Sequence, residues 1–129
     1  MFIVYRASGA DFDPQQFAAT YKLDRCSFWL RWEPNRPGKS APQTSGFRLP
    51  LPDAKTGPEA VLLIRTFIKG GEDWLEALIG QGVHSEVDVG LTVGSEATFT
   101  ASVTFDPSFL GELARHQIGL VCSAYPSSD

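Results

Sequence analysis

The tripeptide Phe-Asp-Pro opens two stretches near opposite ends of the chain, "FDPQQFAATYKL" at Phe12–Leu23 and "FDPSFLGELARHQIGL" at Phe105–Leu120. In each, the Asp side chain can accept a hydrogen bond from the free N–H groups of a first helical turn. The Pro suits the first helical position, because its missing N–H would have no partner there. Apolar residues at helical spacing follow both steps. Each stretch therefore predicts a helix that begins at its Asp-Pro step.

Strand-like sequence flanks both predicted helices. Runs rich in β-branched and aromatic residues precede them at 2–7 and 97–105, and apolar runs follow them at 26–32 and 118–125. The chain therefore predicts two β-α-β units that share one sheet. Since such crossovers are almost always right-handed, we expect both helices on the same face of that sheet.

The middle of the chain holds a longer helical pattern and another strand. Residues 58–82 keep one helical phase, with a break expected at Gly70-Gly71, and residues 83–94 alternate as a strand that we expect to turn back as a hairpin into 97–105. The segment 33–45 is a predicted loop, and 46–53 is an edge strand at best because of its prolines. Residues 1–129 are expected to form a single α+β domain: a two-layer sandwich with a mostly antiparallel sheet and helices on one face, similar to ferredoxin-like arrangements.

Composition excludes several classes of protein. A chain of 129 residues with 43% apolar residues is typical of a single globular domain. Its two cysteines form no Cys-x-x-Cys pair and its two histidines do not complete a zinc site, so we expect no metal, no cofactor and two thiols in a reducing cytoplasm. No apolar run approaches the roughly 20 residues of a membrane span.

Charge is unevenly distributed along the chain. The net charge of −4 argues against nucleic-acid binding, which depends on excess Lys and Arg. Between Lys22 and Arg48, however, six basic and two acidic residues give 6 − 2 = +4, and the other positions give 5 − 13 = −8. One basic segment therefore interrupts an acidic chain.

Aromatic and basic residues interleave within this segment, in "CSFWLRWEPNRPGK" and shortly after it. Trp and Arg concentrate binding energy at interfaces, which makes them candidate binding residues. The alternative is that the tryptophans cap a sheet face and the arginines are only solvated. The candidates are Trp29, Arg31, Trp32, Arg36, Lys39 and Arg48.

Other polar groups have simpler structural explanations. His84, Glu86 and Asp88 alternate along one strand, as expected for a solvated strand face. His116 follows Arg115 in a last helical turn, where a cation suits the helix dipole. No catalytic constellation is evident. If the protein were an enzyme, His84, Glu86 and His116 would be its only plausible acid-base groups.

The layout "VYRASGADFDPQQFAATYKL" with the closing "FDPSFLGELARHQIGLVCSAY" resembles a family of small bacterial proteins classified as a domain of unknown function. The resemblance implies a similar ending of strand, Asp-Pro helix and final strand, and it implies no catalytic residues. We expect a non-catalytic binding protein, such as an immunity protein that neutralises a basic toxin, acting as a monomer or homodimer. The alternative is a module that binds a small or anionic ligand through the basic segment, and an enzyme of unknown type is the third hypothesis.

Overall fold

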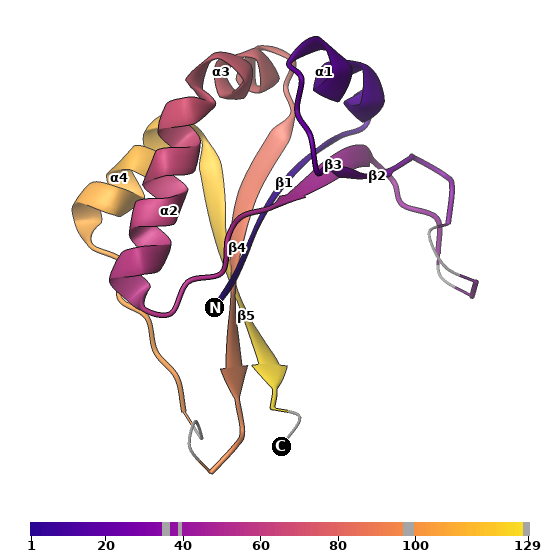
Figure 1. Ribbon diagram of the computed structural model, residues 1–129. Coiled ribbons are helices and arrows are strands. Elements are labelled where there is room, and N and C mark those ends of the chain that lie inside the picture. Colours follow the sequence, from indigo (N-terminus) through magenta and orange to yellow (C-terminus); the bar gives the residue numbers. More distant parts are fainter. Residues whose placement is uncertain (35–36, 39, 97–99, 128–129) are drawn as a thin grey trace.

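The computed structural model describes residues 1–34, 37–38, 40–96 and 100–127. It is an α+β structure with five strands and four helices in the described part of the chain (Figure 1). The strands are β1 (Phe2–Gly9), β2 (Ser27–Trp29), β3 (Ser45–Pro50), β4 (His84–Val93) and β5 (Ile118–Pro126). The helices are α1 (Pro14–Thr20), α2 (Gly57–Gly70), α3 (Glu72–Gly80) and α4 (Pro107–Arg115).

The strands form one mixed sheet with the order β2-β3-β1-β4-β5. Three of its pairings are antiparallel, and only β4 and β5 run parallel. β1 is the central strand and pairs with β3 on one side and β4 on the other. Because β1 pairs with β4, strands from the two halves of the chain meet at the centre of the sheet.

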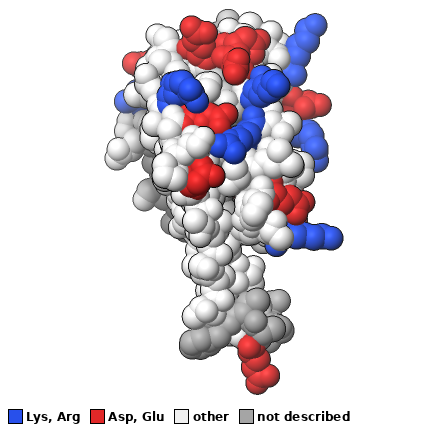
Figure 2. Space-filling model, turned by 90° about the vertical axis from the view of Figure 1, so that its left-hand side faces the viewer, with Lys and Arg blue, Asp and Glu red and all other residues white. Residues whose placement is uncertain are grey.

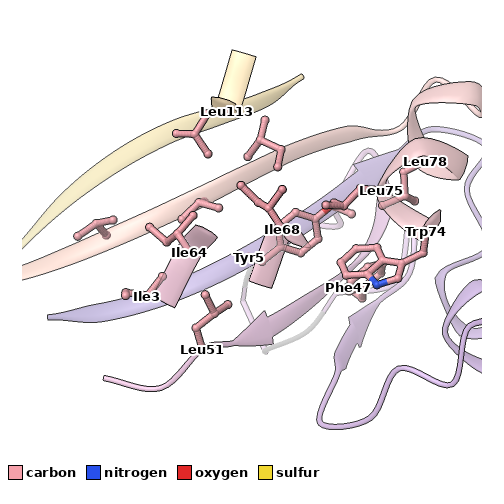
Figure 3. Packing of buried hydrophobic residues seen from close by; sticks show 14 of the residues in the cluster. Ile3, Tyr5, Phe47, Leu51, Ile64, Ile68, Trp74, Leu75, Leu78 and Leu113 are labelled. Atoms are coloured by element: carbon pink, nitrogen blue, oxygen red, sulfur yellow. The ribbon is translucent and has the colours of Figure 1, made fainter. Parts of the chain in front are cut away.

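The helices cover one face of this sheet, as expected. Alternate residues of β1 face the helices and are buried, and residues from all the helices join them in one apolar cluster. Figure 1 shows the helices on this face, and Figure 3 shows part of the cluster, with side chains from α2, α3 and α4. Tyr5 lies at its centre, with ring centroids 5.9 Å from Phe47 and 5.5 Å from Trp74. Its hydroxyl forms a buried 2.6 Å hydrogen bond with Ser85 of β4, so this buried polar group has a hydrogen-bond partner.

Both Asp-Pro steps begin helices. The Asp13 carboxylate accepts a 3.1 Å hydrogen bond from the Gln16 N–H, and Asp106 accepts one of 2.8 Å from the Phe109 N–H. A proline occupies the first turn of α1 and of α4. The sequence-based prediction that a helix begins at each Asp-Pro step is therefore confirmed.

The predicted break in the central helical pattern is also confirmed. α2 ends at Gly70 and α3 begins at Glu72, with Gly71 between them as the cap of both. Gly71 is buried, and a β-carbon there would lie 2.6 Å from the Trp74 indole. The glycine therefore allows Trp74 to fold back onto the helix junction and into the core.

The predicted strand at 97–105 is wrong for its described part, 100–105, which is irregular; Phe99 and its two preceding residues lie outside the described residues. The expected hairpin with β4 is wrong as well. β4 already has β1 on one side and β5 on the other, which leaves no position for a further strand. The apolar residues of the segment pack on helices instead: the Phe105 ring lies 5.5 Å from that of Phe109.

The ferredoxin-like expectation is met only in part. β3 lies between β1 and β2, so the first β-α-β unit spans an intervening strand instead of forming a neighbouring pair. β3 is also not an edge strand. Its single proline, Pro50, is tolerated because β2 pairs only with residues 46–48, so Pro50 has a strand neighbour on the β1 side alone.

None of the helices that the structure describes has the length and apolar character needed to cross a lipid bilayer.

The helix caps give a direct test of this fold. Replacing Asp106 with Ala leaves the Phe109 N–H without its acceptor and should lower the free energy of unfolding by about 1 kcal/mol. Asp106→Asn, which keeps an acceptor, should cost less. Urea denaturation monitored by circular dichroism measures both. Equal losses in the two variants would contradict the capping role.

Candidate functional site

The side of the sheet opposite the helices, here called the open face, is not covered by any helix in the described part of the chain (Figure 1). Strand alternation determines which residues lie on it. Cross-strand partners form rows across the sheet, such as Ser27, Arg48, Arg6 and Glu86. The open face therefore has a charged row near its middle.

Arg6 of β1 forms ion pairs with two residues of β4, Glu86 in this row and Asp88 in the neighbouring row. Its Nε lies 2.9 Å from a Glu86 carboxylate oxygen, and its Nη2 lies 2.9 Å from an oxygen of Asp88. The Ser123 hydroxyl donates a 2.8 Å hydrogen bond to the other Asp88 oxygen. Burial lowers the pKa of Arg6, but its hydrogen bonds to Asp88 and Glu86 outweigh that effect and raise it. The network holds one cation and two carboxylates, so Arg6 is fully paired and the group keeps a formal charge of 1 − 2 = −1.

The expectation of a solvated strand face at His84, Glu86 and Asp88 is thus only partly correct. Asp88 is buried, with 7% exposure, because Arg6 and Ser123 surround its carboxylate. His84 is exposed, and its Nε2 lies 3.6 Å from Glu86. No group of three potential metal ligands occurs among the described residues.

Arg48 lies beside Arg6 on the open face, and among the described residues it has no ion pair. It is exposed and forms part of the wall of a shallow depression of about 220 Å³. Most of the wall is apolar. The other lining residues are Phe2, Ile3, Val4, Pro50, Leu51, Asp53 and Tyr125.

Two exposed aromatic residues flank this depression. Phe2 is 56% exposed and Tyr125 is 48% exposed. Tyr125 packs over Gly90 of the neighbouring strand, where a β-carbon would lie 2.8 Å from its ring. Gly90 therefore provides the space in which the Tyr125 ring lies against the sheet.

Trp29 lies on the same face at the β2 edge. It pairs with Gly46 across the strands, and a β-carbon on Gly46 would lie only 2.4 Å from the Trp29 indole. The indole therefore packs on the bare glycine backbone and is half-buried. Among the predicted site residues, Trp29 and Arg48 are thus brought onto one surface.

Arg31 and Trp32 lie beyond the end of β2, where the strand alternation no longer applies. Arg31 donates a 3.1 Å hydrogen bond to the Ala10 carbonyl and approaches Asp11 at 3.8 Å. Its guanidinium also lies 4.9 Å from the centroid of the Trp32 ring, in a cation–π arrangement. Trp32 has a left-handed φ of 66° and is 59% exposed. This pair therefore belongs to the loop beside α1.

The remaining predicted site residues, Arg36 and Lys39, lie outside the described residues. Sequence analysis missed Phe2, Pro50 and Tyr125, which come from three different strands. The alternation in β1 was the available signal, because a strand with Tyr5 buried places Phe2 on the opposite side.

A second depression, of about 670 Å³, lies on the helix side between α3 and α4. It is lined by three glutamates and Ile79, Arg115 and His116. Figure 2 shows a group of acidic side chains at the top of this side of the molecule, with acidic and basic side chains intermixed below it. His116 caps α4, and its Nδ1 lies 2.9 Å from the Glu112 carbonyl, in agreement with the structural role expected from the sequence.

No protein-family model, curated protein or solved structure matches the chain.

The contact between Gly46 and Trp29 can be tested by adding a single methyl group. In Gly46→Ala the new β-carbon would lie 2.3 Å from the Ala7 carbonyl and 2.4 Å from the indole, so the free energy of unfolding should fall by roughly 1–3 kcal/mol. Gly111→Ala in α4 is the matched control. Outside the local helix backbone, no atom lies within 4 Å of its β-carbon, and the substitution should stabilise the protein by about 0.5–1 kcal/mol. Chemical denaturation measures both, and a tolerated Gly46→Ala would contradict this packing.

The Arg6 network can be tested with a double-mutant cycle. Arg6→Met removes the cation that faces the Asp88 carboxylate, whose side chain is 9% exposed, and should cost roughly 2 kcal/mol. Combined with Asp88→Asn, the two losses should be clearly less than additive. Arg65→Met breaks a more exposed ion pair with Glu112 and should cost less than about 1 kcal/mol. Additive losses for Arg6 and Asp88 would contradict the coupling.

Proposed function

We propose that this chain is a non-catalytic protein-binding domain and that the open face around the depression is its binding surface. One observation carries the proposal: Phe2, Tyr125 and Arg48 are exposed around one apolar depression on an uncovered sheet face. Aromatic residues and Arg are enriched at the centres of protein interfaces, where they supply most of the binding energy.

The dimensions of the depression favour a protein over a small ligand. Its volume of about 220 Å³ is below the roughly 300–1,000 Å³ of ordinary ligand pockets. A side chain of a partner protein fits such a volume, and the surrounding strand surface supplies the rest of the contact. Arg48, which lacks an ion pair among the described residues, would pair with a carboxylate of the partner.

A toxin that this protein neutralises is one partner of this kind. The net charge of −4 would attract a partner that is basic overall and increase the association rate, whereas the contact at Arg48 is local. The two requirements are compatible, because long-range attraction depends on total charge and specificity depends on individual contacts.

Site-specific photo-crosslinking tests the proposal. A photoreactive phenylalanine at Phe2 should give a discrete adduct with another protein in cells that express the chain naturally, and the same group at Leu62, which is 64% exposed on α2, should not. Arg48→Glu should abolish the adduct, and Lys69→Glu on α2 should retain it. With the purified partner, Arg48→Ala should weaken binding about tenfold or more.

Equal adducts at Phe2 and Leu62, or none at either position, would contradict this surface. Saturable binding of inorganic phosphate by the wild type, lost in Arg48→Ala, would favour the small-anion module instead. Calorimetry measures that binding directly.

A further inference from the structure

The two outer strands of the sheet differ in length and charge. β2 has only three residues and is followed closely by Arg31. β5 has nine residues, Ile118–Pro126, with no charged side chain and a single proline at its end. In the described part of the chain no strand pairs with its outer edge. A long uncharged edge of this kind is a template for pairing with another strand, and natural proteins usually protect such edges.

One flank of α4 beside this edge is also apolar. Phe109 and Leu113 are buried in the core, and Glu112 holds Arg65 of α2 at 2.7 Å. Leu110 lies one position after Phe109 and therefore occupies the flank of α4 away from α2, where it is 42% exposed. Ala114 lies one turn further on the same flank and is exposed.

The ends of β4 and β5 extend beyond the helices (Figure 1), and the molecule is narrow in its lower part in Figure 2. β5 runs parallel to β4 throughout this extension. On the side of β5 that continues the buried face from Ile118, Cys122 and Ala124 are exposed. The extension therefore has small, uncharged residues on a side that is buried higher in the sheet.

We propose that β5 pairs with β5 of a second copy of this chain in an antiparallel, two-fold symmetric arrangement. If all nine residues of β5 take part in the pairing, the two-fold axis passes beside Cys122, the middle residue of Ile118–Pro126. Leu120 then lies opposite the partner's Ala124. Residues opposite one another then lie on the same face, so the two sheets form one continuous sheet with both helical layers on the same side.

This arrangement brings the apolar surfaces together. α4 leads into the start of β5, and antiparallel pairing places that start beside the projecting end of the other copy. The flank with Leu110 and Ala114 would then face the extension of the second copy. Because β5 is uncharged, the symmetry opposes no like charges along the strand, which would be destabilising.

The size of the contact predicts a weak dimer. Nine residues at roughly 3.3 Å each give a seam of about 30 Å. With a depth of about 15 Å for strand and helix flank, the pair would bury on the order of 1,000 Å² in total, at the low end for specific interfaces. The association should therefore depend on concentration in the micromolar range or above.

Light scattering and cross-linking test this interface. Between about 1 µM and about 1 mM, the mass should rise from 14.1 kDa toward 28.2 kDa, twice the monomer mass. Cys26→Ser leaves Cys122 as the only cysteine, and a short bis-maleimide should link it into dimers at the higher concentrations. Cys122→Ser, which leaves Cys26, should retain the dimer by light scattering and give no cross-link.

Charge at the axis should break the dimer without unfolding the chain. Cys122→Lys opposes two cations and should shift the half-dimerisation concentration at least tenfold, and Leu110→Glu should do so from the helix side. Ala19→Lys, on an exposed position of α1, is the matched control. Melting temperature and circular dichroism check that each variant is folded. A monomer throughout the range, or a dimer unaffected by Cys122→Lys and Leu110→Glu, would overturn the proposal.

Discussion

The structure depends on the pairing of β1 with both β3 and β4, which places the N-terminal strand at the centre of the sheet. On one side of β1, Ile3, Tyr5 and Ala7 are almost completely buried under the helices. Tyr5 joins aromatic residues from β3, α2 and α3 to a hydroxyl on β4. Because neither β3 nor β4 pairs with the other, both halves of the sheet are held together through this strand.

The same constraint creates the open face. A strand that buries alternate residues must present the others on the opposite side, and no described helix covers that side. At the centre, the Arg6 guanidinium is paired with the Glu86 and Asp88 carboxylates of the same chain. Toward the depression the surface becomes apolar and aromatic, with Arg48 as the exposed cation. The proposed binding surface is therefore the part of the face that internal pairing leaves available.

The open face and the β5 edge are two different surfaces of the same sheet through which another chain could bind. A face is used through side chains, whereas an edge is used through backbone hydrogen bonds, so a partner protein and a second copy need not compete. Ser123 of β5 donates a hydrogen bond to Asp88 on the open face, and Tyr125 of β5 lines the depression. A two-fold dimer would place two open faces on the same side of one continuous sheet, which suits a partner that itself has two binding sites.

The sequence by itself determined the local elements. Asp13 and Asp106 with their prolines specify where helices begin, and the paired glycines specify where the central helix breaks, because these depend on backbone groups within a few residues. Only the tertiary structure decided which strand lies beside which. Residues 100–105 alternate like a strand but cannot pair with β4, because β1 and β5 occupy both of its sides, and β3 contains Pro50 yet lies inside the sheet. Trp29 and Arg48 were recognisable as candidates because they lie in one basic and aromatic segment of the sequence. Phe2 and Tyr125 were not, because strand pairing brings them together from positions more than a hundred residues apart.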